Sequence, residues 1–163
     1  MDVIWEELIS GLPDVRHLAH VLVRLAAAAV LGAVIGFERE RAGKPAGLRT
    51  HMLVTLGTAV FVLACSSSGM NSDGLSRVIQ GVVTGIGFIG AGSILKISED
   101  RNVRGLTTAA GVWMTAAVGV AVGLGSLGVA ILATLFALAV LSFAKRYEHR
   151  VRGRAAGAAD GDD

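Results

Sequence analysis

Residues 78–125 read VIQGVVTGIGFIGAGSILKISEDRNVRGLTTAAGVWMTAAVGVAVGLG, which is two uncharged segments separated by a short charged loop. An interior glycine destabilises a water-soluble helix by about 1 kcal/mol relative to alanine. In a bilayer the backbone has to satisfy its own hydrogen bonds, and glycine lets a second helix approach closely. The stretch therefore predicts a closely packed pair of transmembrane helices. The glycines of its first segment are Gly81, Gly85, Gly87, Gly90 and Gly92.

The composition of the whole chain agrees with a membrane protein. Of its 163 residues, 53% are hydrophobic and 17% are charged, whereas average soluble domains carry about 25% charged residues. The single cysteine, Cys65, excludes an intrachain disulfide and speaks against a cysteine-based metal site. The first twenty residues have no basic region before an apolar run, so we expect the first span to be an uncleaved anchor.

The chain divides into three predicted parts. Residues 1–20 are either a short amphipathic helix at the membrane surface or a frayed terminus. Residues 21–144 form the membrane domain, with uncharged or nearly uncharged segments at 21–37, 52–70, 78–95 and 105–144. The last segment is long enough for two spans of about 20 residues, with a hairpin at 123–128. The prediction is an all-α integral membrane protein with five transmembrane helices, followed by a basic and then disordered tail at 145–163.

The distribution of Lys and Arg predicts the orientation. Basic residues gather in three segments, which an odd number of spans places on one side of the membrane. These residues are Arg39, Arg41, Lys44 and Arg49, then Lys96, Arg101 and Arg104, then Lys145, Arg146, Arg150, Arg152 and Arg154. The opposite side has only Arg16 and Arg77. Because cytoplasmic loops carry an excess of positive charge, we expect the N-terminus outside and the C-terminus in the cytoplasm.

Charged residues at the cytoplasmic ends of the first two spans form a candidate cluster. Glu38, Arg39 and Glu40 follow the first span, and Arg49 opens the second. The favoured interpretation is that Glu38 and Glu40 pair with Arg49 and Arg104 and tie the helix ends together. The alternatives are docking of a partner protein and Mg²⁺ binding, although a hard cation needs several oxygen ligands.

Helix contacts and polar positions complete the candidate residues. Gly32 and Gly36 stand four residues apart, as in a small-residue packing face. On the outer side, Asp73 and Arg77 have the spacing of an ion pair at the start of a helix. Polar groups within the spans either line a pore or, more simply, form interhelical hydrogen bonds. They are Gln80, Thr84, Thr107, Thr108 and Thr115.

The sequence gives little support to catalysis or active transport. No Asp or Glu lies inside a predicted span, whereas proton and cation transporters commonly carry ionisable residues there. Passive permeation stays open. His17, His20, His51 and His149 stand at segment ends and do not suggest a metal site. We found no phosphate loop, nucleophile–base pair or nucleic-acid motif, so we expect no enzyme activity, cofactor, bound metal or nucleic-acid partner.

Three consecutive motifs resemble one family. They are GAVIGFERERAGKPAGLRTHMLVTLGTA at 32–59, DGLSRVIQGVVTGIGFIGAGSIL at 73–95 and NVRGLTTAAGVWMTAAVGVAVGLG at 102–125. In order and spacing they closely resemble the membrane domain of the bacterial MgtC/SapB family. The family's signature would fall on Glu38, Arg39, Glu40, Gly47, Leu48, Arg49 and Thr50, on Asp73, Arg77, Gln80, Gly85, Gly87, Phe88, Gly90 and Gly92, and on Arg104, Gly105, Thr107, Thr108 and Trp113.

The resemblance implies a multi-pass protein of the bacterial inner membrane, with a role in magnesium homeostasis and virulence. Family members are linked to growth in low magnesium, to survival in host phagocytes and to inhibition of the proton-translocating ATP synthase. This chain resembles the short form, without a C-terminal cytoplasmic domain. We therefore expect a regulatory protein, embedded in the lipid bilayer, that contacts membrane subunits of the ATP synthase, another membrane protein or a second copy of itself. The alternatives are a channel or transporter for Mg²⁺, another cation or a small solute, and a purely structural subunit.

Overall fold

The computed structural model describes residues 14–96 and 103–159, and it contains five long helices and one short pair of strands. The helices are α2 (Val15–Arg41), α3 (Leu48–Ser67), α4 (Ser72–Gly92), α5 (Leu106–Gly123) and α6 (Leu127–Ala159), and the strands are β1 (Leu95–Lys96) and β2 (Val103–Arg104). The five predicted helices are confirmed. Four of them, α2 to α5, are long and apolar enough to cross a membrane, and α6 has a shorter apolar part at Leu127–Phe143.

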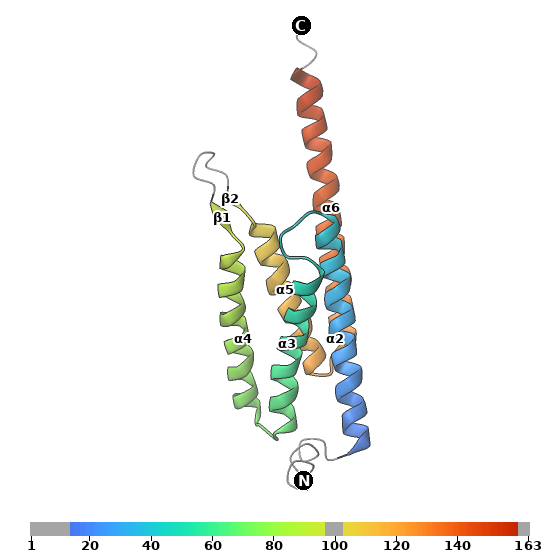
Figure 1. Cartoon of the computed structure of the whole chain (residues 1–163), viewed down its shortest axis with the longest axis vertical. Helices are drawn as coiled ribbons and strands as arrows, with labels where there is room; N and C mark the ends of the chain where they lie inside the picture. Colours follow the sequence, from blue (N-terminus) through green and yellow to red (C-terminus); the bar gives the residue numbers. More distant parts are fainter. Residues whose placement is uncertain (1–13, 97–102, 160–163) are drawn as a thin grey trace.

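The helices run up and down along one axis (Figure 1). The connection between α2 and α3, the β1–β2 ribbon and the C-terminal part of α6 lie at one end, which we call the basic end. The α3–α4 and α5–α6 connections lie at the opposite end, next to the start of α2. Five membrane spans would require this alternation of the connections. The number of helices that cross a bilayer and their orientation stay predictions.

Two segment boundaries differ from the prediction. Residues 15–20 are part of α2 rather than of a separate surface segment, because Asp14 caps the helix there and accepts a hydrogen bond from the Arg16 N–H at 3.3 Å. At the other end, α6 continues to Ala159 through most of the stretch predicted as a disordered tail. Its alanines and arginines are strong helix formers, which explains the continuation. The remaining parts of the two predicted terminal segments, residues 1–13 and 160–163, lie outside the described residues.

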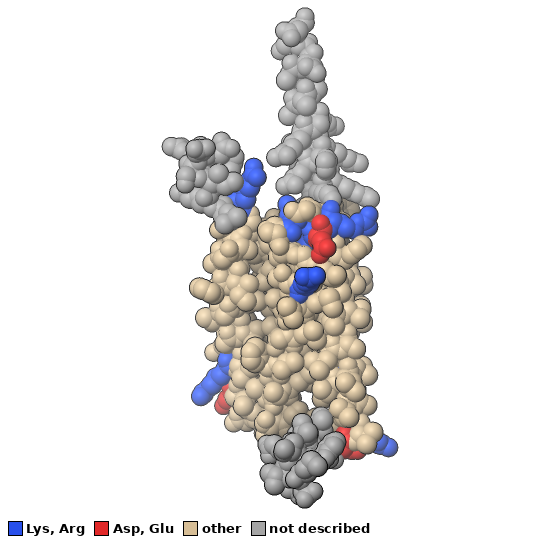
Figure 2. All heavy atoms as spheres, viewed as in Figure 1, with Lys and Arg blue, Asp and Glu red and all other residues tan. Residues whose placement is uncertain are grey.

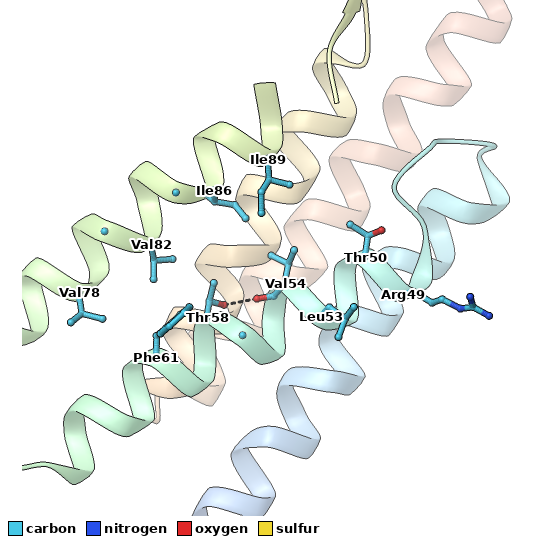
Figure 3. A pocket seen from close by; sticks show the side chains of 13 residues that line it. Arg49, Thr50, Leu53, Val54, Thr58, Phe61, Val78, Val82, Ile86 and Ile89 are labelled. Carbon is cyan, nitrogen blue, oxygen red and sulfur yellow. Dashed lines mark hydrogen bonds between the residues drawn. The ribbon is translucent and has the colours of Figure 1, made fainter. Parts of the chain in front are cut away.

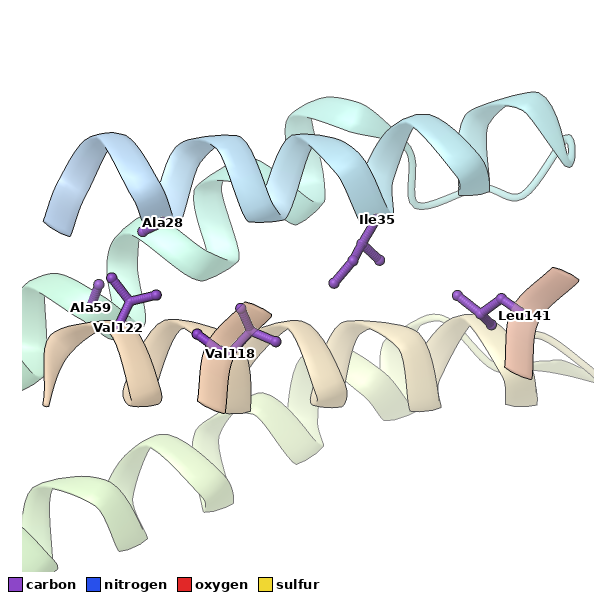
Figure 4. Packing of buried hydrophobic residues seen from close by; sticks show 7 residues of the cluster. Ala28, Ile35, Ala59, Val118, Val122 and Leu141 are labelled. Carbon is purple, nitrogen blue, oxygen red and sulfur yellow. The ribbon is translucent and has the colours of Figure 1, made fainter. Parts of the chain in front are cut away.

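Helix α5 occupies the centre of the bundle and contacts α2, α3, α4 and α6. It contributes Val118 and Val122 to the main buried cluster (Figure 4). The cluster is completed by Ala28 and Ile35 of α2, Ala59 of α3, and Ala130 and Leu141 of α6. Small side chains thus fill the space where α2, α3, α5 and α6 meet, and they let the helices lie close together.

Glycines set the distance between α3 and its two neighbours. A Cβ added to Gly36 of α2 would lie 2.7 Å from the Leu48 Cα, and one added to Gly32 would lie 2.7 Å from the His51 carbonyl oxygen. On the α5 side, Gly119 and Gly123 approach α3 in the same way. A Cβ added to Gly119 would lie only 2.5 Å from the Thr55 carbonyl oxygen. Real Cβ atoms almost never come this close, so these positions need glycine.

The connections are held by specific polar contacts. Glu40 accepts a hydrogen bond from the Leu48 N–H at 2.9 Å and so caps the start of α3. Asn71 caps α4 through the Gly74 N–H at 2.9 Å. At the α5–α6 turn, Arg24 of α2 donates to the Gly123 carbonyl at 3.1 Å, which satisfies a carbonyl at the end of α5.

A short antiparallel ribbon joins α4 to α5, with Leu95 opposite Arg104 and Lys96 opposite Val103. It leads into Gly105, whose φ of 98° lies in the left-handed region. An added Cβ there would collide with the Ser93 carbonyl oxygen. This glycine therefore allows the chain to pass from the ribbon into α5 at close range.

Charged side chains gather toward the two ends of the face shown in Figure 2, with a broad uncharged band between them. Large apolar side chains are exposed on the bundle, including Phe88 on α4 and Phe136 and Phe143 on α6. An uncharged band with exposed apolar side chains is typical of a surface in contact with lipid.

Candidate functional site

Helices α2, α3 and α5 enclose a polar cluster near the basic end, around His51. The His51 side chain is fully buried in α3, and Arg39 of α2 is 2% exposed. Arg39 forms an ion pair with Glu38, with 2.5 Å between Nε and Oε2. Arg39 and Glu38 are also the charged groups close enough to act on the imidazole ring.

The hydrogen bonds of Thr115 define how the His51 ring is held. The Thr115 hydroxyl donates to the Gly111 carbonyl at 2.8 Å and lies 2.6 Å from His51 Nδ1. Which of the two groups donates depends on the tautomer of the imidazole ring. The other ring nitrogen, Nε2, is buried and has no hydrogen-bond partner within the described residues.

Gly36 makes room for this histidine between the helices, because an added Cβ would lie 3.0 Å from the His51 Cβ, closer than most real contacts. Gly111 of α5 also lies beside the ring, where an added Cβ would make an ordinary contact, 3.7 Å from His51 Cε1. An ionisable side chain within a membrane segment is a functional candidate in its own right. A single imidazole is too few ligands for a metal ion, and the part of the chain that the structure describes contains no group of three or more potential metal ligands.

The predicted charged cluster forms differently. Glu38 pairs with its neighbour Arg39, and Glu40 caps α3. Among the described residues, Arg49 and Arg104 form no ion pair with either acid, and both are exposed. The predicted pairing is therefore wrong, because the start of α3 and Arg39 both lie nearer to the carboxylates than the two expected partners.

The predicted outer ion pair does not form either. Asp73 and Arg77 are both exposed, and the described residues show no contact of ion-pair length between them. Asn71 caps α4 in place of Asp73. Exposed pairs of this kind gain little energy from holding two long side chains in one geometry.

Four of the five predicted polar membrane positions do not meet. Thr108 is buried in α5, whereas Thr107 is exposed on the same helix. Gln80 and Thr84 are exposed on α4, and the Thr84 hydroxyl donates to the Gln80 carbonyl at 2.9 Å. The fifth position, Thr115, bonds to His51 of another helix, which is the interhelical contact expected as the simpler alternative to a pore.

Most of the α4 glycines do not pack against another described helix of this chain. Added Cβ atoms on Gly81, Gly85, Gly87 and Gly92 would meet nothing within 4 Å, and only Gly90 contacts another helix, at Ala109 of α5. Within this chain, close helix approach occurs instead at Gly32 and Gly36, which the sequence singled out, and at glycines of α5. Most of the predicted α4 packing face is thus unpartnered in the described part of the molecule.

A comparison of sequences places this arrangement among known proteins. The sequence profile of the MgtC family matches residues 25–150, which include Glu38, Arg39, His51 and the packing glycines described above. The chain belongs to the MgtC family. No solved structure matches this family member.

Several curated relatives share this membrane region. The chain is 45% identical to protein SrpB of Synechococcus elongatus, over 77% of this chain and 75% of that protein. It is 50% identical to protein MgtC of Brucella abortus, over 77% of this chain and 51% of that protein. It is 42% identical to the Escherichia coli protein named "Putative magnesium transporter YhiD", over 76% of this chain and 60% of that protein. The chain thus spans about half the length of the MgtC relative.

His51 is a site residue of this MgtC family member that was not predicted from the sequence. The four histidines stand at the ends of predicted segments, and none of their positions suggests a ligand set. The usable signal was the position of His51 on the second helix, which follows the glycines at 32 and 36 and precedes Thr55 and Thr58 at helical spacing. Its partner Thr115 is 64 positions away, and only the packing of α5 against α3 brings the two together.

Proposed function

We propose that this MgtC family protein is a regulatory protein of the bacterial inner membrane, which crosses the bilayer five times and acts by contacting another membrane protein through α4. The observation that supports this role is the polar surface of α4 that faces away from the bundle. It comprises Ser76, Gln80, Thr84 and Gly87, which are all exposed. We call these four residues the outer α4 face.

Gln80 is the main argument for a partner on this face. It lies eight residues after Ser72, which is about 12 Å along an α-helix. Its Nε2 is 3.5 Å from the Ser76 hydroxyl, at the limit of a hydrogen bond. An amide at this depth that faces hydrocarbon is costly. A neighbouring membrane protein with a matching polar group would relieve that cost, and Gly87 would let its helix come near.

The close packing inside the bundle also favours contact over conduction. Glycine contacts join α2 to α3 and α3 to α5 at distances that leave no space for a side chain. The buried Thr55 and Thr58 hydroxyls donate to carbonyls of their own helix at about 3 Å. These groups are therefore satisfied within α3 and are not directed at a solute.

The proposed partner is the proton-translocating ATP synthase, which the family resemblance implies, and the proposed setting is adaptation to low magnesium or host stress. Relatives named MgtC are about twice as long as the matched region. For this reason we propose only a role that the membrane helices can perform.

Inverted membrane vesicles with and without the protein test this role. ATP-driven proton pumping should fall when the protein is present, while respiration-driven pumping stays unchanged. A fall in both signals would mean that the protein makes the membrane permeable to ions. An unchanged ATP-driven signal would contradict inhibition of the synthase.

The outer α4 face can be tested in the same vesicles. Gln80→Leu should abolish most of the inhibition, because it removes the polar group that the partner recognises. Phe136→Leu on α6 is the matched control, since Phe136 is also exposed to lipid. If Gln80→Leu, Phe136→Leu and the unchanged protein inhibit ATP-driven pumping equally, the contact with the partner lies elsewhere.

Transport of magnesium is the second candidate function. The name of the YhiD relative favours it, as does the presence of a buried ionisable side chain, His51, in a candidate span. Proteoliposomes loaded with a fluorescent Mg²⁺ indicator test it directly. Uptake that His51→Gln abolishes would establish transport, and the absence of uptake would leave the regulatory role alone.

A further inference from the structure

A groove of about 800 Å³ lies between α3 and α4, on the side of α4 away from the outer α4 face. Figure 3 shows Val78, Val82, Ile86 and Ile89 extending from α4 toward α3. Leu53, Val54 and Phe61 of α3 line the other wall, and Gly57, Gly81 and Gly85 widen the space because they have no side chains. The groove therefore suits a flexible apolar ligand.

The polar groups of the groove are concentrated at one end. Arg49 is the only charged residue in its lining, and it stands with Thr50 at the basic end of α3. The third polar residue, Thr58, donates its hydroxyl to the Val54 carbonyl at 2.9 Å, which leaves it no proton for a ligand. In Figure 3 the Arg49 side chain extends from α3 away from α4, so a ligand meets apolar walls along the groove and a cation beside its basic end.

The charge of Arg49 is not neutralised by the nearby acids. Glu38 is paired with Arg39, and Glu40 caps α3. Within the described residues, the Arg49 side chain forms neither an ion pair nor a hydrogen bond. An anion at the mouth of the groove would therefore gain a contact without displacing an existing one.

The length of the groove matches one leaflet of a bilayer. Arg49 and Phe61 are twelve residues apart, or about 18 Å along α3 at the rise of an α-helix. Half of the hydrocarbon core of a bilayer is about 15 Å thick. The charged end also carries most of the basic residues, which is the end expected at the cytoplasmic leaflet and its anionic lipids.

We propose that the α3–α4 groove binds one anionic phospholipid, with its phosphate on Arg49 and an acyl chain between Leu53, Val82 and Ile86. The charge decides in favour of a phospholipid over a partner helix, because an apolar helix would leave Arg49 without an anion. The site does not depend on the proposed regulatory role, since the groove and the outer α4 face lie on different sides of α4.

Native mass spectrometry of the purified full-length protein tests the site, with phosphatidylglycerol and phosphatidylcholine offered separately. The protein should bind phosphatidylglycerol about fivefold more tightly, since one basic residue near the surface contributes about 1 kcal/mol. Arg49→Ala should remove this preference, whereas Arg77→Ala at the opposite end should keep it. Equal loss in both variants, or no preference in the unchanged protein, would overturn the proposal.

Two glycines of α4 provide a control for the acyl chain. Gly85 lines the groove and Gly87 does not, yet an added Cβ meets nothing within 4 Å at either position. Gly85→Leu should fill the groove and weaken the binding of both lipids, and Gly87→Leu should leave binding unchanged. Unaltered binding by Gly85→Leu would show that lipid does not enter the groove.

Two further measurements separate other occupants. Inorganic phosphate should not compete with phosphatidylglycerol at equal concentration, because it lacks the acyl chain; full competition would reduce the site to an anion site and overturn the proposal. In a Cys65→Ser background, Gly85→Cys should not form a disulfide between two copies in membranes. Efficient crosslinking would mean that a second copy fills the groove in place of lipid.

Discussion

At the scale of single residues, the contact between His51 and Thr115 is the most informative feature of the bundle. It joins α3 to α5 by a bond between side chains, whereas the buried hydroxyls of Thr55, Thr58 and Thr134 donate to carbonyls of their own helices. It is also the hydrogen bond that holds a buried imidazole, because Nε2 has no partner among the described residues. Loss of the Thr115 oxygen would leave two unpaired ring nitrogens in the interior.

Thr115→Val should therefore destabilise the folded protein by about 1 to 2 kcal/mol, the usual cost of a buried polar group left without a hydrogen-bond partner. Thr107→Val is the control, since Thr107 is exposed on the same helix. Thermal unfolding in detergent, followed by circular dichroism, measures both. Equal melting temperatures for the two variants would mean that the hydrogen bond contributes little.

Glu40 is a second residue whose role depends on its immediate surroundings. Its carboxylate accepts from the first backbone N–H of α3, where a negative charge is favourable. Glu40→Ala should lower stability by about 1 kcal/mol, and Lys44→Ala in the same connection should leave it unchanged. If the melting temperature of the Lys44 variant falls as far, a general effect of charge would explain the result instead of capping.

Residue roles were only partly predictable from the sequence. Glu38, Arg39 and Glu40 were correctly expected at the end of the first predicted span, because their position follows from the end of an apolar run. Their partners were not, since Arg39 pairs with Glu38 and the Leu48 N–H bonds to Glu40 once the chain is folded. Spacing along a chain constrains contacts within one helix, whereas pairing between helices depends on how each helix is rotated about its axis.

At the scale of helices, the contact between α3 and α5 depends on glycines of α5. Gly119→Ala should lower stability by more than 2 kcal/mol, because the new Cβ would meet the Thr55 backbone, which has no side-chain freedom to move away. Gly57→Ala is the matched control, with open space around its Cα. Unfolding in detergent measures the difference, and equal stability of the two variants would contradict close packing at Gly119.

The helices themselves were predictable, whereas the packing glycines were predictable only for Gly32 and Gly36 of α2. Uncharged runs and a hairpin at 123–128 gave the correct number of helices, since bilayer thickness sets how many residues one span needs. Glycine spacing suggested close approach along the third span, yet Gly81 and Gly85 are open while Gly119 and Gly123 are crowded. The spacing of these glycines places each of them on a face of its helix. Which of these faces another helix covers depends on how the helices pack in the folded bundle.

At the scale of the whole molecule, the connections alternate between two ends, so the proposed orientation can be tested by labelling. In a Cys65→Ser background, Ser68→Cys lies in the α3–α4 connection and Lys44→Cys in the α2–α3 connection. A thiol reagent that cannot cross membranes should label Ser68→Cys in intact cells and Lys44→Cys only after permeabilisation. The reverse pattern would invert the proposed topology, and labelling of both in intact cells would contradict an odd number of spans between them.

The central place of α5 also has a consequence for the order in which the protein is made. During synthesis α2, α3 and α4 enter the membrane before α5 exists. Helices α3 and α4 contact each other less than either of them contacts α5. His51 has then emerged without its hydrogen-bond partner, which is supplied only with the fourth of the five helices. A nascent chain stalled before Thr115 thus presents an unfinished polar surface inside the membrane, which is the kind of feature that insertion chaperones and membrane proteases could recognise.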